Sequence, residues 1–70
     1  MSQHEAFRAT APNGATCAIN LHGGGHAQNM NEEQYRAYKR ARLAVANGRI
    51  SLEQAQQQLE AAGVTAEWLR

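Results

Sequence analysis

Three consecutive glycines, Gly23 to Gly25, divide the chain into two halves with different hydrophobic patterns. Before them, apolar and polar side chains alternate, which is typical of β-strands; after them, apolar residues recur every three or four positions, which is typical of helices. Two histidines, His22 and His26, flank the glycines. Because glycine adopts backbone conformations that other residues avoid, this segment is either a binding loop or a sharp change of direction.

The first half predicts a β-hairpin over residues 6–21 that turns at Pro12–Gly14. A three-residue loop, with its glycine in the left-handed conformation, places Phe7 opposite Ile19. Two strands alone are marginally stable in water, so the apolar face of the hairpin needs a helix or a second hairpin to cover it. The side chains expected on that face are Phe7, Ala9, Cys17, Ile19 and Leu21.

The second half predicts two antiparallel helices followed by a short C-terminal turn, over residues 31–70. Asn31 and Ser51 are the expected N-caps, each followed three residues later by a glutamine that completes a capping box. Gly48 and Gly63 follow the expected helix ends, where the left-handed conformation suits glycine. The expected apolar stripes are Tyr35, Tyr38, Ala41, Val45 and Ala46 on the first helix, and Leu52, Ala55, Leu59 and Ala62 on the second.

The predicted fold is a single small α+β domain over residues 1–70, a hairpin packed on a helix pair in the order ββαα. Residues 1–5 are expected to be a flexible start and residues 22–30 a glycine-rich connector. Alanine supplies fourteen of the hydrophobic residues, so burial of apolar surface barely offsets the loss of chain entropy on folding. We therefore expect a homodimer or a protein partner to add stability.

Composition narrows the class of protein. A net charge of +1 argues against non-specific nucleic-acid binding. The single cysteine, Cys17, excludes an intramolecular disulfide and favours a reducing compartment. The N-terminus lacks the pattern of an export signal, and no stretch approaches the roughly 20 apolar residues of a membrane span. The sequence therefore predicts a cytoplasmic protein that does not contact the membrane.

The glycine-rich segment is the expected ligand-binding site. Successive glycine N–H groups form a nest that holds an anion, and flanking histidines add donors. Neither a phosphate-binding P-loop nor a dinucleotide fingerprint is present. A nucleotide or another anion, bound in an oligomer, is the alternative to a protein partner. The residues concerned are His22, Gly23, Gly24, Gly25 and His26.

Cys17, His22 and His26 are candidate zinc ligands with the spacing C-x4-H-x3-H, and His4 is available as a fourth. Thiolate sulfur and imidazole nitrogen suit Zn²⁺, and a metal stabilises small domains. In the predicted register, however, Cys17 points into the core and His22 has the opposite strand parity. No metal or other cofactor is therefore predicted, and a zinc-stabilised module is the third interpretation.

The segment Leu21–Gly25 resembles the His-Gly-Gly-Gly segment of α/β-hydrolase esterases, in which backbone N–H groups form an oxyanion hole. The chain has no Gly-x-Ser-x-Gly motif, and its only serines are Ser2 and Ser51. A dyad of Cys17 and a histidine would require an exposed thiol, whereas the predicted hairpin buries it. The sequence therefore predicts a protein that is not an enzyme.

Two surfaces are expected to bind a partner. Arg36, Lys39 and Arg40 project together with Leu43 from one side of the first helix, and Trp68 with Leu69 forms an anchor at the C-terminus. The second helix is too long to be the turn of a helix-turn-helix, so a nucleic acid is not the expected partner. The predicted function is stoichiometric binding to another protein by a small regulator or inhibitor of the kind that phages and mobile elements encode.

Overall fold

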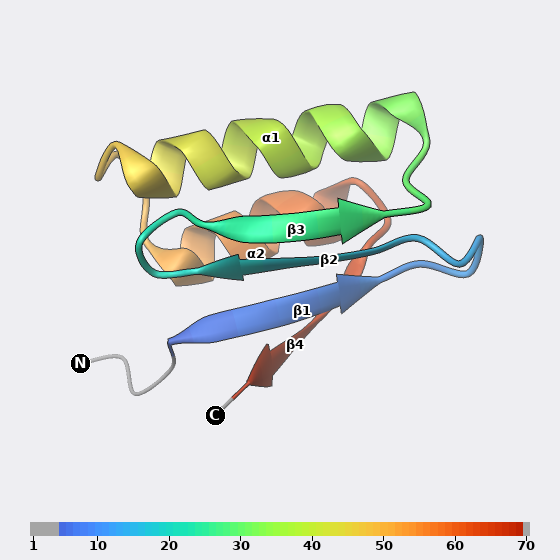
Figure 1. The fold of residues 1–70 in the computed structure, drawn as a ribbon, viewed down its shortest axis with the longest axis horizontal. Helices are drawn as coiled ribbons and strands as arrows, with labels where there is room; N and C mark the ends of the chain where they lie inside the picture. The colour runs from blue at the N-terminus through green and yellow to red at the C-terminus, as the bar shows by residue number, and fades with distance from the viewer. Residues whose placement is uncertain (1–4, 70) are drawn as a thin grey trace.

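The computed structural model describes residues 5–69 as a four-stranded antiparallel sheet with two helices on one face (Figure 1). The strand order in the sheet is β3-β2-β1-β4, so the first three strands form a meander and the last returns to pair with the first. The elements are β1 (Ala6–Thr10), β2 (Thr16–Asn20), β3 (Gly25–Gln28), α1 (Glu32–Ala46), α2 (Leu52–Ala61) and β4 (Thr65–Leu69). The α+β class is as predicted, but the order is βββααβ rather than ββαα.

The N-terminal hairpin has the predicted register, with Phe7 opposite Ile19. Gly14 adopts the left-handed conformation at φ 86°, and the Ala11 N–H donates to the Ala15 carbonyl at 3.0 Å to close the loop. The prediction for Leu21 was wrong, since its side chain is 46% exposed. Strand β2 ends one residue earlier, where the chain turns towards β3.

The predicted connector over residues 22–30 contains a strand. β3 pairs antiparallel with β2, and Ala27 lies opposite Cys17. Gly25 approaches β2 so closely that a Cβ atom there would be 1.9 Å from the Ala18 carbonyl oxygen. The four residues of β3 are small or polar and have low intrinsic strand propensity, so pairing with β2 overrides a local pattern that does not indicate a strand.

The predicted C-terminal helical turn is also a strand. β4 pairs antiparallel with β1 and places Trp68 opposite Phe7, with ring centroids 5.7 Å apart in an edge-to-face arrangement. The backbone of β1 offers a free edge to the returning chain, and alternation in β4 turns Ala66 and Trp68 towards the helices. The ladder bonds and the aromatic contact therefore favour a strand over a single isolated helical turn.

Both helices begin and end at the predicted residues. Complete capping boxes form at Asn31 and at Ser51. α2 ends in a Schellman motif, in which the Val64 N–H donates to the Leu59 carbonyl at 3.0 Å and both side chains are fully buried. The α1 stripe was wrong at Tyr35 and Ala46, which are exposed, while the buried position that begins the stripe is taken by Gln34.

Contacts at both ends fix the position of α1 over the sheet. At its start, Gln34 and Asn13 of the β1–β2 turn form a reciprocal amide pair with donor–acceptor distances of 3.1 and 3.3 Å. At its end, Arg42 Nη1 donates to the Gly23 carbonyl at 3.3 Å. Ala46 lies so close to Gly23 that a Cβ atom there would be 2.3 Å from the alanine methyl group.

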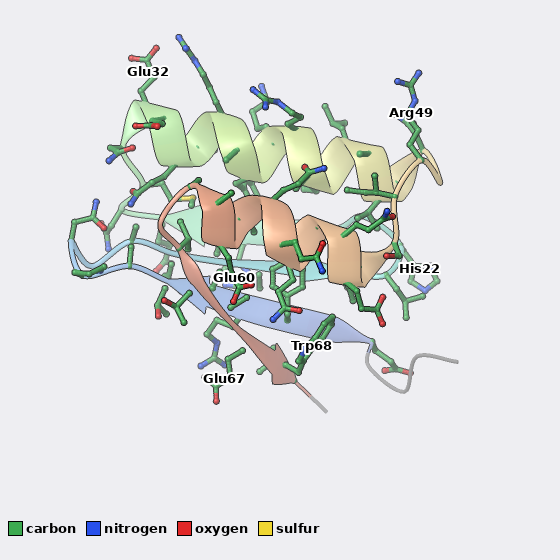
Figure 2. All side chains as sticks on the ribbon, turned by 180° about the vertical axis from the view of Figure 1, so that it is seen from behind. His22, Glu32, Arg49, Glu60, Glu67 and Trp68 are labelled. Atoms are coloured by element: carbon green, nitrogen blue, oxygen red, sulfur yellow. The ribbon has the colours of Figure 1, made fainter. Side chains whose placement is uncertain are left out.

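The hydrophobic core lies between the helical layer and one face of the sheet. The helices of the same chain therefore cover the apolar side of the hairpin, and a homodimer remains a prediction. Figure 2 shows Glu32 and Arg49 on the outer side of the helices and Glu67 beyond the sheet. The core residues are Phe7, Ala9, Cys17, Ile19, Tyr38, Ala41, Val45, Leu52, Ala55, Leu59 and Val64.

Candidate functional site

The outer face of α1, defined here as Arg36, Lys39, Arg40 and Leu43, is the surface on which predicted binding residues meet. Spacings of three and four residues place these side chains next to one another on a helix. All four are exposed, and Leu43 leaves 47% of its surface in contact with solvent. α1 carries four of the seven basic residues of the chain, so this face combines positive charge with one apolar side chain.

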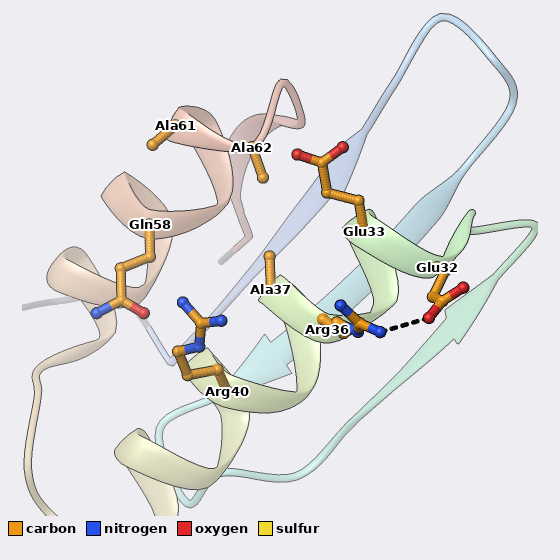
Figure 3. A pocket seen from close by; sticks show the side chains of 8 residues that line it. All are labelled: Glu32, Glu33, Arg36, Ala37, Arg40, Gln58, Ala61 and Ala62. Carbon is orange, nitrogen blue, oxygen red and sulfur yellow. Dashed lines mark hydrogen bonds and ion pairs between the residues drawn. The ribbon is translucent and has the colours of Figure 1, made fainter.

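An open groove of about 590 Å³ runs between α1 and α2 beside this face (Figure 3). Three of the residues that line the groove, Ala37 of α1 and Ala61 and Ala62 of α2, have small side chains. Alanine methyl groups leave space there that longer side chains would fill. The lining residues are Glu32, Glu33, Arg36, Ala37, Arg40, Gln58, Ala61 and Ala62.

The two arginines of the groove differ in their ion pairing. Arg36 forms an ion pair with Glu32 at 2.5 Å, and both side chains are more than two-thirds exposed, so the pair stabilises the fold little. Arg40 makes no ion pair or hydrogen bond within residues 5–69, and Figure 3 shows it reaching from α1 towards α2. Its guanidinium is therefore available to a carboxylate on another molecule.

The flank of α1 that faces away from α2 is also cationic. Lys39 is the one lysine of the chain, and its Nζ lies 5.8 Å from the centroid of the Tyr35 ring. That ring lies 5.9 Å from the ring of Tyr38, which is buried. Lys39 therefore lies over one ring of a tyrosine pair, the other ring of which is buried. The sequence did not predict this arrangement, because both tyrosines were expected in the core.

The glycine-rich segment has a structural explanation. Asn20 Oδ1 accepts hydrogen bonds from the N–H groups of His22 and Gly24 at 2.9 and 3.0 Å, and its carbonyl oxygen accepts from the Gly23 N–H at 2.9 Å. These three N–H groups belong to the predicted anion nest, and each already donates a hydrogen bond within the turn. An anion at this position would have to displace Asn20.

The candidate zinc ligands are not brought together. Cys17 is fully buried on the helix side of the sheet, whereas His26 lies on the other side because its neighbour Ala27 is the residue opposite Cys17. His22 lies in the exposed turn between β2 and β3. Within residues 5–69, no group of three His, Cys, Asp or Glu side chains is placed to hold a metal ion. His4 lies outside the described residues.

Cys17 is also a weak nucleophile. Burial raises the pKa of its thiol to about 11, an effect that a hydrogen bond with the Ala9 backbone partly offsets. The thiol is therefore protonated at neutral pH, and the thiolate is the form that attacks electrophiles and binds metals.

The predicted C-terminal anchor lies apart from the outer face of α1. Trp68 is half-buried on the helix side of β4, against Phe7. Leu69, also half-buried, has the opposite strand parity and lies on the open face of the sheet. The predicted partner-binding residues therefore fall into two separate regions, of which the basic one adjoins the groove.

Comparison of the chain with protein-family models, curated proteins and solved structures finds no match. In the part of the chain that the structure describes, no helix has both the length and the apolar character that crossing a membrane requires.

Proposed function

We propose that the protein is a non-catalytic regulator or inhibitor that binds an acidic segment of another cytoplasmic protein through the outer face of α1 and the adjoining groove. The observation that carries this proposal is Arg40. It is a cation without an acidic partner among residues 5–69, at the side of an open groove that three alanines line together with charged and polar side chains. A carboxylate entering the groove gains a charge-assisted hydrogen bond there without displacing an existing ion pair.

The mixed chemistry of the surface favours a protein over a nucleic acid. Leu43 is half-exposed among the cations, and an apolar side chain surrounded by charged groups suits the buried centre of a protein interface. Glu32 and Glu33 line the same groove as Arg36 and Arg40, so a polyphosphate, which carries a charge on every unit, would be repelled at the glutamates, whereas a peptide can direct a single carboxylate at Arg40. A partner with both acidic and apolar side chains matches this pattern.

The test is capture of partners from the native host with two single charge reversals. Arg40→Glu places a negative charge at the groove, whereas Arg49→Glu makes the same change in the turn between the helices, away from it. Arg49 is exposed, and its side chain makes no ion pair or hydrogen bond with the other residues of the range 5–69. Captured proteins are quantified by mass spectrometry, with nuclease added so that nucleic acid does not bridge them.

We expect Arg40→Glu to reduce the yield of a specific, stoichiometric partner about tenfold, and Arg49→Glu to leave it near the wild-type level. That partner should have an acidic segment at the site of contact. Equal loss with both variants would show that only net charge matters. Capture of DNA or RNA in place of a protein, when nuclease is omitted, would also contradict the proposal.

A further inference from the structure

β3 forms one edge of the sheet, and no other strand within residues 5–69 lies on its outer side. The Asn20 N–H donates to the Gly24 carbonyl at 2.9 Å, which makes this pair a hydrogen-bonded one. Hydrogen-bonded and non-hydrogen-bonded pairs alternate along antiparallel strands. His26 therefore bonds to β2, whereas Gly25 and Ala27 direct their N–H and C=O groups away from the sheet.

β3 is short, but it contains no Lys, Arg, Asp, Glu or Pro residue. Natural sheets guard their edges with charged side chains, proline or a bulge. β3 contains only Gly-His-Ala-Gln, and it is mostly exposed. The opposite edge strand, β4, is guarded by a negative charge at its centre, Glu67, which is exposed on the open face. β3 is therefore the edge that more readily accepts another strand.

The flank of α1 on this side of the molecule is positively charged. Arg42 reaches the Gly23 carbonyl, two residues before β3 begins, and this contact identifies the flank that lies above β3. Lys39, three residues earlier on the helix, extends the flank over the exposed ring of Tyr35. An incoming strand with carboxylates on its helix side meets opposite charge here, whereas a second copy of the chain would bring like charges together.

We infer that the outer edge of β3 accepts an extended acidic segment of a partner protein as a fifth strand. Main-chain hydrogen bonds to Gly25 and Ala27 supply affinity, and the cations above the edge select acidic side chains. This inference shares Lys39 with the outer face of α1, but the edge is separate from the groove between the helices, and its occupation requires neither Arg36 nor Arg40. A negative result at the β3 edge can therefore be told apart from a negative result for the proposed function.

The test uses a capped heptapeptide of alternating threonine and glutamate, with a threonine–lysine heptapeptide as the control. Binding is followed by amide chemical shifts of the isotope-labelled protein. Ala27→Pro removes one outward N–H and leaves the bonds between β2 and β3 intact, because proline lacks the donor. Ala66→Pro is the matched control, since Ala66 occupies the equivalent outward position on β4. The odd-numbered residues of β1 bond to β2, so its even-numbered residues bond to β4. Arg8 therefore bonds to Glu67, which lies opposite it, and the N–H of the neighbouring Ala66 points away from the sheet.

We expect the glutamate peptide to shift the amides of Gly25 and Ala27 and to bind about fivefold more tightly than the lysine peptide. Ala27→Pro should weaken binding about fivefold or more, and Ala66→Pro and Arg40→Glu should not. Lys39→Glu, which leaves the backbone unchanged, should reverse the preference between the peptides. This variant decides the matter if circular dichroism shows that Ala27→Pro is unfolded.

Three results would overturn the inference. The first is shifts at β4 in place of β3. The second is that the wild-type protein and the Lys39→Glu variant each bind the two peptides equally tightly. The third is a concentration-dependent dimer that Ala27→Pro abolishes, which would show that a second copy occupies the edge. Sedimentation of the protein without peptide detects that dimer.

Discussion

At the residue scale, Gly23 is the glycine whose replacement the fold tolerates least. Its φ of +85° matches the φ of +86° at Gly14, but a Cβ at Gly23 would be 2.3 Å from Ala46, whereas Gly14 faces open space. Gly14→Ala should therefore cost about 1 kcal/mol, from the left-handed conformation alone. Gly23→Ala should cost about 3 kcal/mol or more, because the end of α1 must also move. Equal free energies of unfolding in urea would show that α1 does not pack on this turn.

Cys17 should make stability depend on pH in the alkaline range. Its pKa is raised from 9.0 to about 11, so the folded protein binds the thiol proton more tightly than the unfolded chain does. This contribution is complete well below pH 9 and is lost as the pH rises through 9 to 11, in total on the order of 3 kcal/mol. Burial also raises the pKa of Tyr38, which acts in the same direction.

Chemical denaturation from pH 7 to pH 11 measures this dependence. Cys17→Val, which has a side chain of similar size and no titrating group, should make the curve less steep between pH 9 and pH 11 and leave the smaller slope that Tyr38 contributes. Modification of the wild-type thiol by iodoacetamide should be slow until the protein unfolds. Fast modification under native conditions would contradict the buried position of Cys17.

At the scale of elements, the amide pair between Asn13 and Gln34 joins the hairpin to the start of α1. Gln34 completes a capping box and also forms this pair, whereas Gln54 completes the capping box of α2 alone. Gln34→Ala should therefore cost about 2 kcal/mol and Gln54→Ala about 1 kcal/mol. A double-mutant cycle should give about 1 kcal/mol of coupling for Asn13 with Gln34, and none for Asn13 with Gln54. Equal coupling in both cycles would show that the hairpin turn does not hold α1.

Elements with strong local signals could be predicted from the sequence. The capping boxes at Asn31 and Ser51 and the left-handed glycines Gly14 and Gly63 define boundaries by interactions within a few residues. β3 could not be predicted, because its residues Gly-His-Ala-Gln carry no strand pattern of their own and it forms through pairing with the neighbouring β2. β4 could not be predicted, because it pairs with a strand at the other end of the chain. β4 pairs with a strand more than fifty residues earlier, and no short-range pattern reports such a pairing.

At the scale of the whole molecule, the sequence identified the basic side of α1 but not what lies beside it. The spacing of Arg36, Lys39 and Arg40 gives their common face directly. The groove depends on how α1 packs against α2, and the open edge of β3 depends on the order of the strands in the sheet. Two candidate surfaces thus adjoin one helix, on its two flanks, and both favour acidic partners.

Lys39 gives the most direct test of this account, because it is the only lysine and lies on the outer face of α1. A carbodiimide joins an amine to a carboxylate in direct contact, with loss of water and no spacer. The captured complex is treated with carbodiimide after the N-terminal amine has been acetylated, and the linked peptides are sequenced by mass spectrometry. Lys39→Arg is the control that keeps the charge and removes the reactive amine.

We expect amide links between Lys39 and aspartate or glutamate side chains of the partner, clustered in one acidic segment and absent with Lys39→Arg. An intact complex in which Lys39 forms no link to a partner carboxylate would contradict the central claim that the protein binds an acidic partner through α1.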